Sequence, residues 1–309
     1  VPAHMLGIHG GTHGAMTGRM LADLEGVLLA EKPDAVLVYG DTNSTLAGAL
    51  AAVKLHIPVA HVEAGLRSFN MRMPEEVNRI LTDRISRWLF TPTDAAAAHL
   101  AREGAPASSI IPAGDVMYDA ALHFGDRAAK PKGAIAQLGL KPQQYILATV
   151  HRAENTDDAR RLAVIVDALS AAAANALPVV WPMHPRTRAI LDRDANLSAS
   201  ALRLHLIDPV GYIDMVQLEK NAAVIATDSG GVQKEAYFYR VPCVTLRDET
   251  EWIELVSAGW NRLAPPLDAN AVHHAIRTAI GTYGANIAPY GTGDAAQKIV
   301  ARLASDLCG

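Results

Sequence analysis

Short apolar runs rich in β-branched residues alternate along this chain with longer segments whose apolar positions recur at helical spacing. Runs of this length, bounded by turn-forming residues, are typical of strands buried in a sheet. Their alternation with helical segments predicts βαβ units and parallel sheets, and therefore an α/β fold class. The expected strands are Ala35–Tyr39, Val59–Val62, Trp88–Thr91, Ile110–Pro112, Tyr145–Val150, Val179–Met183, Leu202–Ile207, Ala223–Ala226 and Cys243–Leu246.

Helices are predicted between these strands and at the end of the chain. No strand is expected before Asp34, and the glycine-rich segment His9–Gly14, which follows no strand, is interpreted as a loop. The expected helices are Thr45–Lys54, Pro74–Arg87, Asp94–Glu103, Asp157–Asn175, Arg186–Asp192, Tyr212–Lys220, Gly231–Tyr239, Glu251–Ala258, Ala269–Tyr283 and Asp294–Asp306.

A polar stretch rich in helix-breaking residues, Arg127–Gly133, separates one alternating set from the next. Domain boundaries fall in such segments, so we place the boundary just before it, near Gly114–Tyr118. The amino-terminal domain is then expected to cover residues 1–115 and the carboxy-terminal domain residues 116–295.

The composition narrows the class of protein. At 309 residues, 50% of them hydrophobic and 5% aromatic, the chain is long enough for two domains with substantial cores. No apolar run approaches the roughly 20 residues of a membrane span, and the amino end lacks the layout of a signal peptide. Cys243 and Cys308 make no disulfide framework, and a net charge of −4 without a basic stripe argues against nucleic-acid binding. We therefore expect a cytoplasmic protein without membrane or nucleic-acid partners.

Two turns rich in small and hydroxyl residues, Gly40–Thr45 and Asp228–Glu235, each follow an apolar run and open a helical segment. Such turns lie at the carboxyl edge of a parallel sheet, where free backbone N–H groups point outward. Because the two turns fall in different halves of the chain, they predict one anionic ligand held between two domains.

Carboxylates follow several strands of the first half. Asp41 and Glu63 come just after predicted strands, and Glu75 begins a helix after Pro74. Taken singly, Asp41 fits a helix cap and Glu75 fits a first-turn charge that complements the helix dipole. Together at one sheet edge they suit an acid/base site, because crowded carboxylates repel and one can hold a proton while another stays a base.

Basic residues follow two strands of the second half, in His151–Asn155 and His184–Arg186. The two histidines could bind zinc, but no third His or Cys stands at a fitting spacing, so no metal site is expected. A histidine beside an arginine better suits contact with phosphate. The Ser229–Gly231 turn offers backbone amides to a diphosphate, and Glu235, one turn later on the same helix face, could accept hydrogen bonds from two ribose hydroxyls. No Gly-x-Gly-x-x-Gly or Walker motif follows a strand, so neither a tightly bound dinucleotide nor ATP is indicated.

With these motifs the chain resembles the non-hydrolysing UDP-N-acetylglucosamine 2-epimerases over essentially its whole length. The segments that carry the resemblance follow one another in the family's order. They are Val38–Thr45, His61–Ser68, Met73–Arg79, Thr149–Asn155, Asp228–Glu235, Leu246–Glu251 and Pro289–Ala295.

The resemblance implies a GT-B-like fold, in which two Rossmann-like parallel-sheet domains enclose the active-site cleft and the last helix, here residues 296–309, returns to the first domain. It implies conversion of UDP-N-acetylglucosamine to UDP-N-acetylmannosamine without a cofactor. A base removes the proton at C2 while UDP leaves from C1, and UDP adds again after reprotonation on the other face. A homodimer is also implied.

By motif position, Asp41, Glu63 and Glu75 match the family's acid/base carboxylates, and His151 matches the histidine near the departing diphosphate. The substrate-binding residues are expected to be Arg67, Arg152, Glu154, Asn155, His184, Arg186, Ser229, Gly230, Gly231, Glu235 and Arg247.

The sequence departs from the family in two places. Trp252–Glu254 stands where some members carry Arg-Pro-Glu and others Trp-Val-Glu, and the latter include epimerases of oxidised diacetamido UDP-sugars, an alternative substrate. The family's opening strand, its glycine-containing loop and its second strand have no counterpart, so Ala35–Tyr39 is expected to lack a partner and the isolated chain to turn over poorly. A GT-B glycosyltransferase, a hydrolysing epimerase and an inactive nucleotide-sugar-binding protein are the alternatives.

Overall fold

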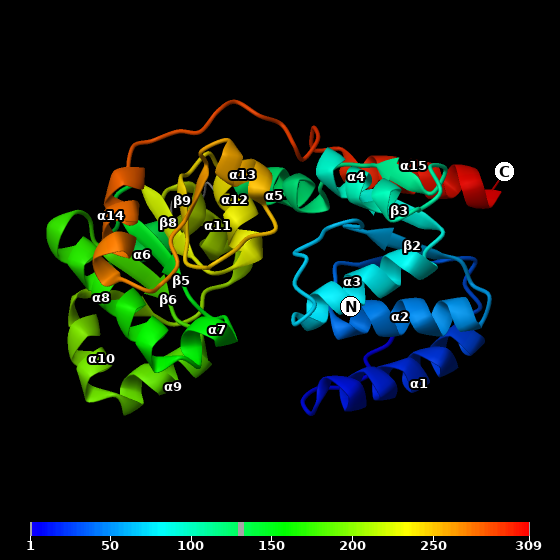
Figure 1. The fold of residues 1–309 in the computed structure, drawn as a ribbon, viewed down its shortest axis with the longest axis horizontal. Coiled ribbons are helices and arrows are strands. Elements are labelled where there is room, and N and C mark those ends of the chain that lie inside the picture. Colours follow the sequence, from blue (N-terminus) through cyan, green and yellow to red (C-terminus); the bar gives the residue numbers. More distant parts are fainter. Residues whose placement is uncertain (1, 129–132, 309) are drawn as a thin grey trace. The chain divides into compact units, whose positions relative to one another are not determined.

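The computed structural model describes residues 2–128 and 133–308 (Figure 1). The chain divides into two compact units, unit 1 with Val1–Asp119 and Ala288–Gly309, and unit 2 with Ala120–Ile287. Most of the predicted linker, residues 129–132, lies outside the described residues. Every described helix is too short or too polar for a membrane span.

Unit 1 is built on a four-stranded parallel sheet of order β1-β2-β3-β4. Parallel neighbours need crossover connections, and helices supply them here. The strands are β1 (Val36–Tyr39), β2 (Val59–Val62), β3 (Trp88–Thr91) and β4 (Ile110–Pro112), and the helices are α1 (His13–Glu31), α2 (Asn43–Lys54), α3 (Pro74–Ile85), α4 (Asp94–Arg102), α5 (Val116–Arg127) and α15 (Ala295–Cys308).

Residues from the two ends of unit 1 share one core. Ile299 of α15 packs with Ala60 and Val62 of β2 and with Phe90 of β3. In addition, the indole Nε1 of Trp88 donates a hydrogen bond to Oδ2 of Asp306, 2.7 Å away. The carboxy-terminal helix therefore completes a sheet whose strands lie some 200 positions earlier in the sequence.

Unit 2 holds a six-stranded parallel sheet of order β10-β9-β8-β5-β6-β7. The strands are β5 (Ile146–Thr149), β6 (Val179–Pro182), β7 (His205–Ile207), β8 (Val224–Thr227), β9 (Cys243–Thr245) and β10 (Asn261–Leu263). The helices are α6 (Ala134–Gln137), α7 (Ala153–Thr156), α8 (Ala159–Asn175), α9 (Pro185–Arg193), α10 (Ala195–Ser200), the 3₁₀ helix Ala201–Arg203, α11 (Tyr212–Lys220), α12 (Gly230–Phe238), α13 (Ile253–Ser257) and α14 (Ala269–Ala279).

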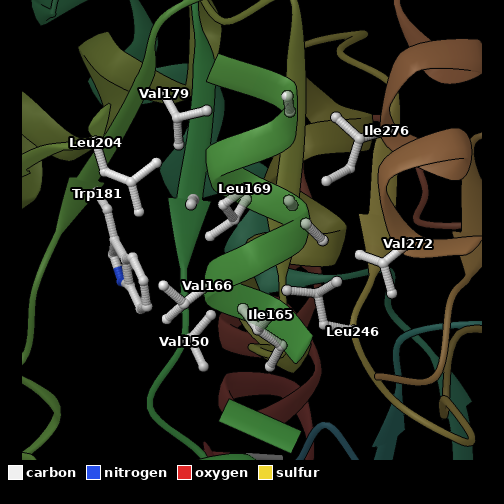
Figure 2. Close-up of a cluster of buried hydrophobic side chains, with 14 of the residues drawn as sticks. Val150, Ile165, Val166, Leu169, Val179, Trp181, Leu204, Leu246, Val272 and Ile276 are labelled. Carbon is white, nitrogen blue, oxygen red and sulfur yellow. The ribbon is translucent and has the colours of Figure 1, made fainter. Parts of the chain in front are cut away.

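Helix α8 anchors the larger core of unit 2. Its residues Ile165, Val166 and Leu169 are fully buried and project among side chains of the sheet and of α14, as Figure 2 shows. Their spacing of three and four residues gives α8 one continuous apolar face, as the helical period predicts. The carboxylate of Asp158 caps the helix by accepting from the amides of Arg160 and Arg161.

The nine predicted strands are all present, with differences at their ends and in the shorter elements. The predicted strand Leu202–Ile207 is wrong over its first residues, because Ala201–Arg203 forms a 3₁₀ turn that leaves Leu202 84% exposed. Strand β10, with a charged residue at its centre, has no apolar run and was not predicted. Helix α5 was not predicted either, and it begins where Asp115 accepts a hydrogen bond from the amide of Met117 at 2.7 Å.

Strand β1 forms the edge of its sheet. Among the described residues it pairs with β2 alone, and Leu37 and Tyr39 are 37% and 56% exposed. The expectation that Ala35–Tyr39 would lack a partner on one side is thus met in this chain. An edge strand presents unpaired backbone groups along its free side.

Gly65, just after β2, gives a direct test of the packing in unit 1. It has φ +82°, and a Cβ there would lie 2.4 Å from the carbonyl oxygen of Ala96. Gly104 has φ +81° with no heavy atom within 4 Å of such a Cβ. We expect Gly65→Ala to lower the free energy of unfolding by about 3 kcal/mol or more, because backbone cannot move aside, whereas Gly104→Ala should cost only about 1–2 kcal/mol of left-handed strain. Urea unfolding measures both, and equal losses would contradict the predicted clash.

Candidate active site

Asp41 lies two residues beyond β1, at the carboxyl edge of the unit 1 sheet. Arg79 of α3 donates from Nη2 to Oδ2 of Asp41 at 2.7 Å, and Asn78 donates to the backbone carbonyl of Asp41 at 2.9 Å. The hydroxyl of Thr45 donates to the carbonyl of Tyr39. Asp41 is therefore held by its neighbours and does not cap α2, whose N-cap is Thr42.

Glu63 follows β2 directly and has φ +73°, an uncommon conformation for a residue with a side chain. Gly40, beside it after β1, has φ +65°, and a Cβ on Gly40 would lie 3.6 Å from Oε2 of Glu63. The Glu63 carboxylate therefore lies against the turn that carries Asp41. Non-glycine residues with such strained backbone conformations are found most often at functional sites.

The charges of these carboxylates act on one another. Burial raises the pKa of Asp41, the Arg79 guanidinium opposes that shift, and the charges of Glu63 and Glu75 raise the pKa further. The structure thus brings together the three acidic side chains singled out in the sequence. A carboxyl with a raised pKa beside ionised neighbours is suited to proton transfer.

Helix α3 carries a polar face that sequence inspection did not single out. Glu76 is 1% exposed and accepts hydrogen bonds from the amides of Ser68 and Phe69, at 2.9 Å each. Arg79 lies 3.2 Å from Glu76 on one side and bonds Asp41 on the other. The sequence does contain a signal for this pair. An acidic and a basic residue stand three positions apart on a helix that begins at this sheet edge.

Arg67, predicted to bind substrate, is instead buried within unit 1. Its guanidinium contacts the carboxylates of Asp83 and Glu103 at 2.7 Å each. Asp83 also lies 2.6 Å from Nδ1 of His61, and Nε2 of His61 lies 2.7 Å from the carbonyl oxygen of Gly40. His61 therefore supports the Gly40–Asp41 turn, and Arg67 holds Asp83, the partner of His61. A substrate contact of Arg67 stays a prediction.

Asp228, one residue beyond β8, organises the sheet edge in unit 2. It is fully buried and accepts hydrogen bonds from the amides of His151 and Arg152 and from Nδ2 of Asn155, all at 3.1 Å. Asn155 also donates to the carbonyl of Leu246 at 3.0 Å. Asp228 thereby fixes the loop after β5 and leaves the His151 ring half exposed, with Nδ1 3.6 Å from the Asp228 carboxylate.

The Ser229 turn opens α12. The hydroxyl of Ser229 accepts a hydrogen bond from the amide of Val232 at 3.4 Å, so the amides of Gly230 and Gly231 lie at the helix start. A Cβ on Gly230 would lie 3.8 Å from Nη2 of Arg152 and 3.7 Å from Nε1 of Trp252. Backbone amides and a guanidinium around one small residue suit an anion, and Oε2 of Glu251 would also lie 4.0 Å from that Cβ.

A second arginine near this turn is bound by acidic side chains. Arg247 is buried and bonds Glu251 at 2.9 Å, while Glu154 lies 3.6 Å from its Nε. Burial opposes ionisation of Glu251, but the hydrogen bonds and charge of Arg247, with the charge of Arg152, hold its pKa below the ordinary value. Arg152 keeps 28% of its side chain exposed, whereas Arg247 exposes 2%, so Arg152 is the more accessible cation.

His151 and His184 line one cavity of about 240 Å³ at the ends of β5 and β6, together with apolar side chains that include Val210, Met215 and Val232. His184 caps α9 by accepting from the amide of Arg186 at 3.2 Å. Arg186 is exposed and paired with Asp157. Among the described residues no three side chains of the metal-binding types are grouped as a metal site requires.

Glu235 lies one turn into α12, with 8% of its surface exposed. Its Oε1 accepts a hydrogen bond from the hydroxyl of Tyr212 at 3.1 Å. Burial raises its pKa, an effect that Tyr212 and Lys234 counteract.

Comparison with known proteins agrees with this geometry. Residues 1–304 match the protein family described as UDP-N-acetylglucosamine 2-epimerase. The chain belongs to that family, a family of isomerases. The UDP-2,3-diacetamido-2,3-dideoxy-D-glucuronate 2-epimerase of Pseudomonas aeruginosa is 54% identical over 306 residues, which cover 98% of this chain and 84% of that enzyme. The UDP-N-acetylglucosamine 2-epimerase of Methanocaldococcus jannaschii is 48% identical over 268 residues, 85% of this chain and 73% of that enzyme.

Solved structures extend the likeness to the fold. The Methanocaldococcus jannaschii epimerase in complex with UDP-GlcNAc and UDP has a TM-score of 0.90 at 44% identity, covering 99% of this chain and 85% of that one. The Neisseria meningitidis epimerase bound to UDP-GlcNAc has a TM-score of 0.85 at 31% identity, covering 96% and 82%. The expected family and the GT-B-like class of two Rossmann-like parallel sheets are confirmed.

The role of Asp228 can be tested through stability. Asp228→Ala leaves two backbone amides and one donor of Asn155 without their acceptor, so we expect the free energy of unfolding to fall by about 2–3 kcal/mol. Asp248→Ala is a matched control, because that carboxylate is 61% exposed and pairs, within the described part of the chain, with Arg161 alone, and its loss should cost less than about 1 kcal/mol. Urea unfolding gives both values, and hydrogen exchange at the His151 amide should quicken in the first variant alone.

Proposed function

We propose that this protein epimerises C2 of a UDP-activated 2-acetamido sugar, by elimination and re-addition of UDP. The observation that carries the proposal is the group of carboxylates, Asp41, Glu63 and Glu75, within electrostatic reach of one another in a chain of this family. A base takes the proton from C2, the C1–O bond breaks and UDP departs with the bonding electrons, which leaves a C1–C2 double bond. Protonation of C2 on the opposite face and return of UDP complete the epimerisation.

The carboxylates of unit 1 are proposed to move the C2 proton. Asp41 has a raised pKa and a fixed partner in Arg79, which suits a group that both accepts and returns a proton. Glu63 is held against the Asp41 turn by its strained backbone, which limits the side chain to few orientations.

Residues of unit 2 are proposed to hold UDP. The amides at the start of α12 and the Arg152 guanidinium offer donors to the diphosphate, and a half-exposed His151 could stabilise the leaving group as charge develops on it. Glu154, Asn155, Arg247, His184 and Arg186 complete the proposed binding segment, with Asn155 and Arg247 acting from buried positions. Glu235 is assigned to the ribose hydroxyls.

Two sugars are candidates. UDP-N-acetylglucosamine is the first, and a UDP-2,3-diacetamido-uronate is the second, which the 54% identity to the Pseudomonas aeruginosa enzyme and the Trp252 motif favour. Trp252 donates from Nε1 to the carbonyl of Gly230 at 3.0 Å, so the distinguishing residue adjoins the proposed diphosphate turn. Steady-state kcat/KM with both sugars decides between them. A chain that releases free sugar or needs an acceptor would contradict the proposal.

A homodimer and a cytoplasmic location stay predictions. Sedimentation equilibrium of the purified chain tests the first of them, and a monomer at micromolar concentration that retains activity would contradict it.

The proton-transfer role predicts a specific loss. Asp41→Asn and Glu63→Gln should each lower kcat by about 100-fold or more with little change in UDP affinity, because each removes a proton acceptor and keeps the shape. Asp94→Asn, an exposed change in the first turn of α4, serves as control and should leave kcat unaltered. Solvent deuterium entering C2 at the normal rate in both active-site variants would refute the assignment.

The diphosphate role predicts a binding defect without unfolding. A Cβ at Gly230 meets no atom closer than 3.7 Å, so we expect the fold to tolerate Gly230→Val. The methyl groups of the valine would extend toward Arg152 and lower UDP affinity at least about tenfold. Gly26→Val, on an exposed helix position with open space, is the matched control. Calorimetry with UDP measures both variants. Unchanged affinity in Gly230→Val would place the diphosphate elsewhere.

A further inference from the structure

One fully buried carboxyl group has no part in the proposed chemistry. Glu219 lies in α11 with 0% exposure, and no donor among the described residues reaches either of its oxygens. An ionised carboxylate in such a position would be very costly, because it would have lost its water and gained no cation. The group therefore needs either a proton or a partner.

Its partner is Glu235, across from α11 on α12. The two carboxyl groups act on each other directly, and since ionised carboxylates only accept, a hydrogen bond between them requires one shared proton. Glu235 also accepts from the hydroxyl of Tyr212, which comes from the start of α11, at 3.1 Å. With a proton on Glu219, the Glu235 carboxylate would receive two donors from the same neighbouring helix.

The surroundings decide which carboxyl keeps the proton. Burial and then the charge of Glu235 raise the pKa of Glu219 well above its usual range, whereas Tyr212, Lys234 and the bond from Glu219 counteract the rise at Glu235. The other titratable groups that sense Glu219 are Tyr145, Tyr239 and Cys243, and each has its own pKa raised, first by burial. None of these three is a cation that would favour the ionised form of Glu219.

We propose that Glu219 is a positioning residue, a neutral carboxylic acid that donates a hydrogen bond to Glu235 and, with Tyr212, orients that carboxylate toward the vicinal hydroxyls of a ribose. A carboxylate has about four lone-pair directions. Glu219 and Tyr212 occupy two of them, and the others are left for two hydroxyl donors. The inference rests on the proposed function, because it takes the Glu235 ligand to be the ribose of UDP.

The experiment compares two probes, UDP and 2′,3′-dideoxy-UDP, by calorimetry. Wild-type protein should prefer UDP, since only UDP offers the hydroxyls. Glu219→Met keeps the volume and removes the donor, so we expect UDP affinity to fall about tenfold while affinity for the dideoxy probe changes less than about twofold. Glu219→Gln supplies an amide donor in the same place and should restore the preference to within about threefold of wild type.

Glu235→Gln separates this inference from the function on which it rests. If that variant keeps the wild-type preference for UDP, the ribose assignment fails and the inference with it. If Glu235→Gln loses the preference but Glu219→Met keeps it, the inference alone is overturned. Equal losses for both probes in Glu219→Met, or the same loss in Glu219→Gln, would also overturn it, because a merely structural role would not depend on the hydroxyls or on a donor at this position.

Discussion

Parallel strand pairing in register is the constraint on which both halves of the site depend. In unit 1 Tyr39 pairs with Val62, and the amide of Gly40 donates to the carbonyl of Val62, so Asp41 and Glu63 leave the sheet side by side. In unit 2 Thr149 pairs with Thr227, and the amide of Asp228 donates to the carbonyl of Thr149, which brings the His151 loop to the Asp228 carboxylate. Because parallel strands all end at one edge, a shift of one residue in either register would separate each set.

Charges buried behind these strand ends make the geometry specific. Arg79 lies between Asp41 and Glu76, and Arg67 lies between Asp83 and Glu103. Both guanidinium groups are buried, as are Glu76 and Asp83, whereas Asp41 and Glu103 keep 31% and 42% of their side chains exposed. The fully buried pairs add little net stability but strongly oppose loss of one partner. Buried carboxyl groups of unit 2 are compensated without a cation. Backbone amides bind Asp228, and in our proposal a proton is held between Glu219 and Glu235. Each buried carboxyl orients a group nearer to the exposed sheet edge.

Much of the fold could be predicted because local pattern and tertiary environment agree. Strands such as Val59–Val62 are buried along their whole length, as strands covered on two sides are, and helix α8 shows an unbroken apolar face. The strand predictions fail where the local pattern and the tertiary environment disagree. Strand β10 carries Arg262 at its centre, and Leu202 is apolar yet lies 84% exposed in a 3₁₀ turn. The local sequence around Arg262 does not distinguish a strand from a loop, and that around Leu202 does not distinguish a buried strand from an exposed turn. Packing against the rest of unit 2 decides both.

By itself the sequence determined which residue types follow each strand, because strand boundaries, small turn residues and carboxylates are all local features. That was sufficient for the fold class, the family and the set Asp41, Glu63 and Glu75 at one sheet edge. The tertiary structure alone decided the partner of each side chain. It commits Arg67 to Asp83 and Glu103, leaves Arg152 accessible, and places Glu219 of one helix against Glu235 of the next. Burial and charge pairing join residues far apart in the chain, and a pattern read along one segment contains neither.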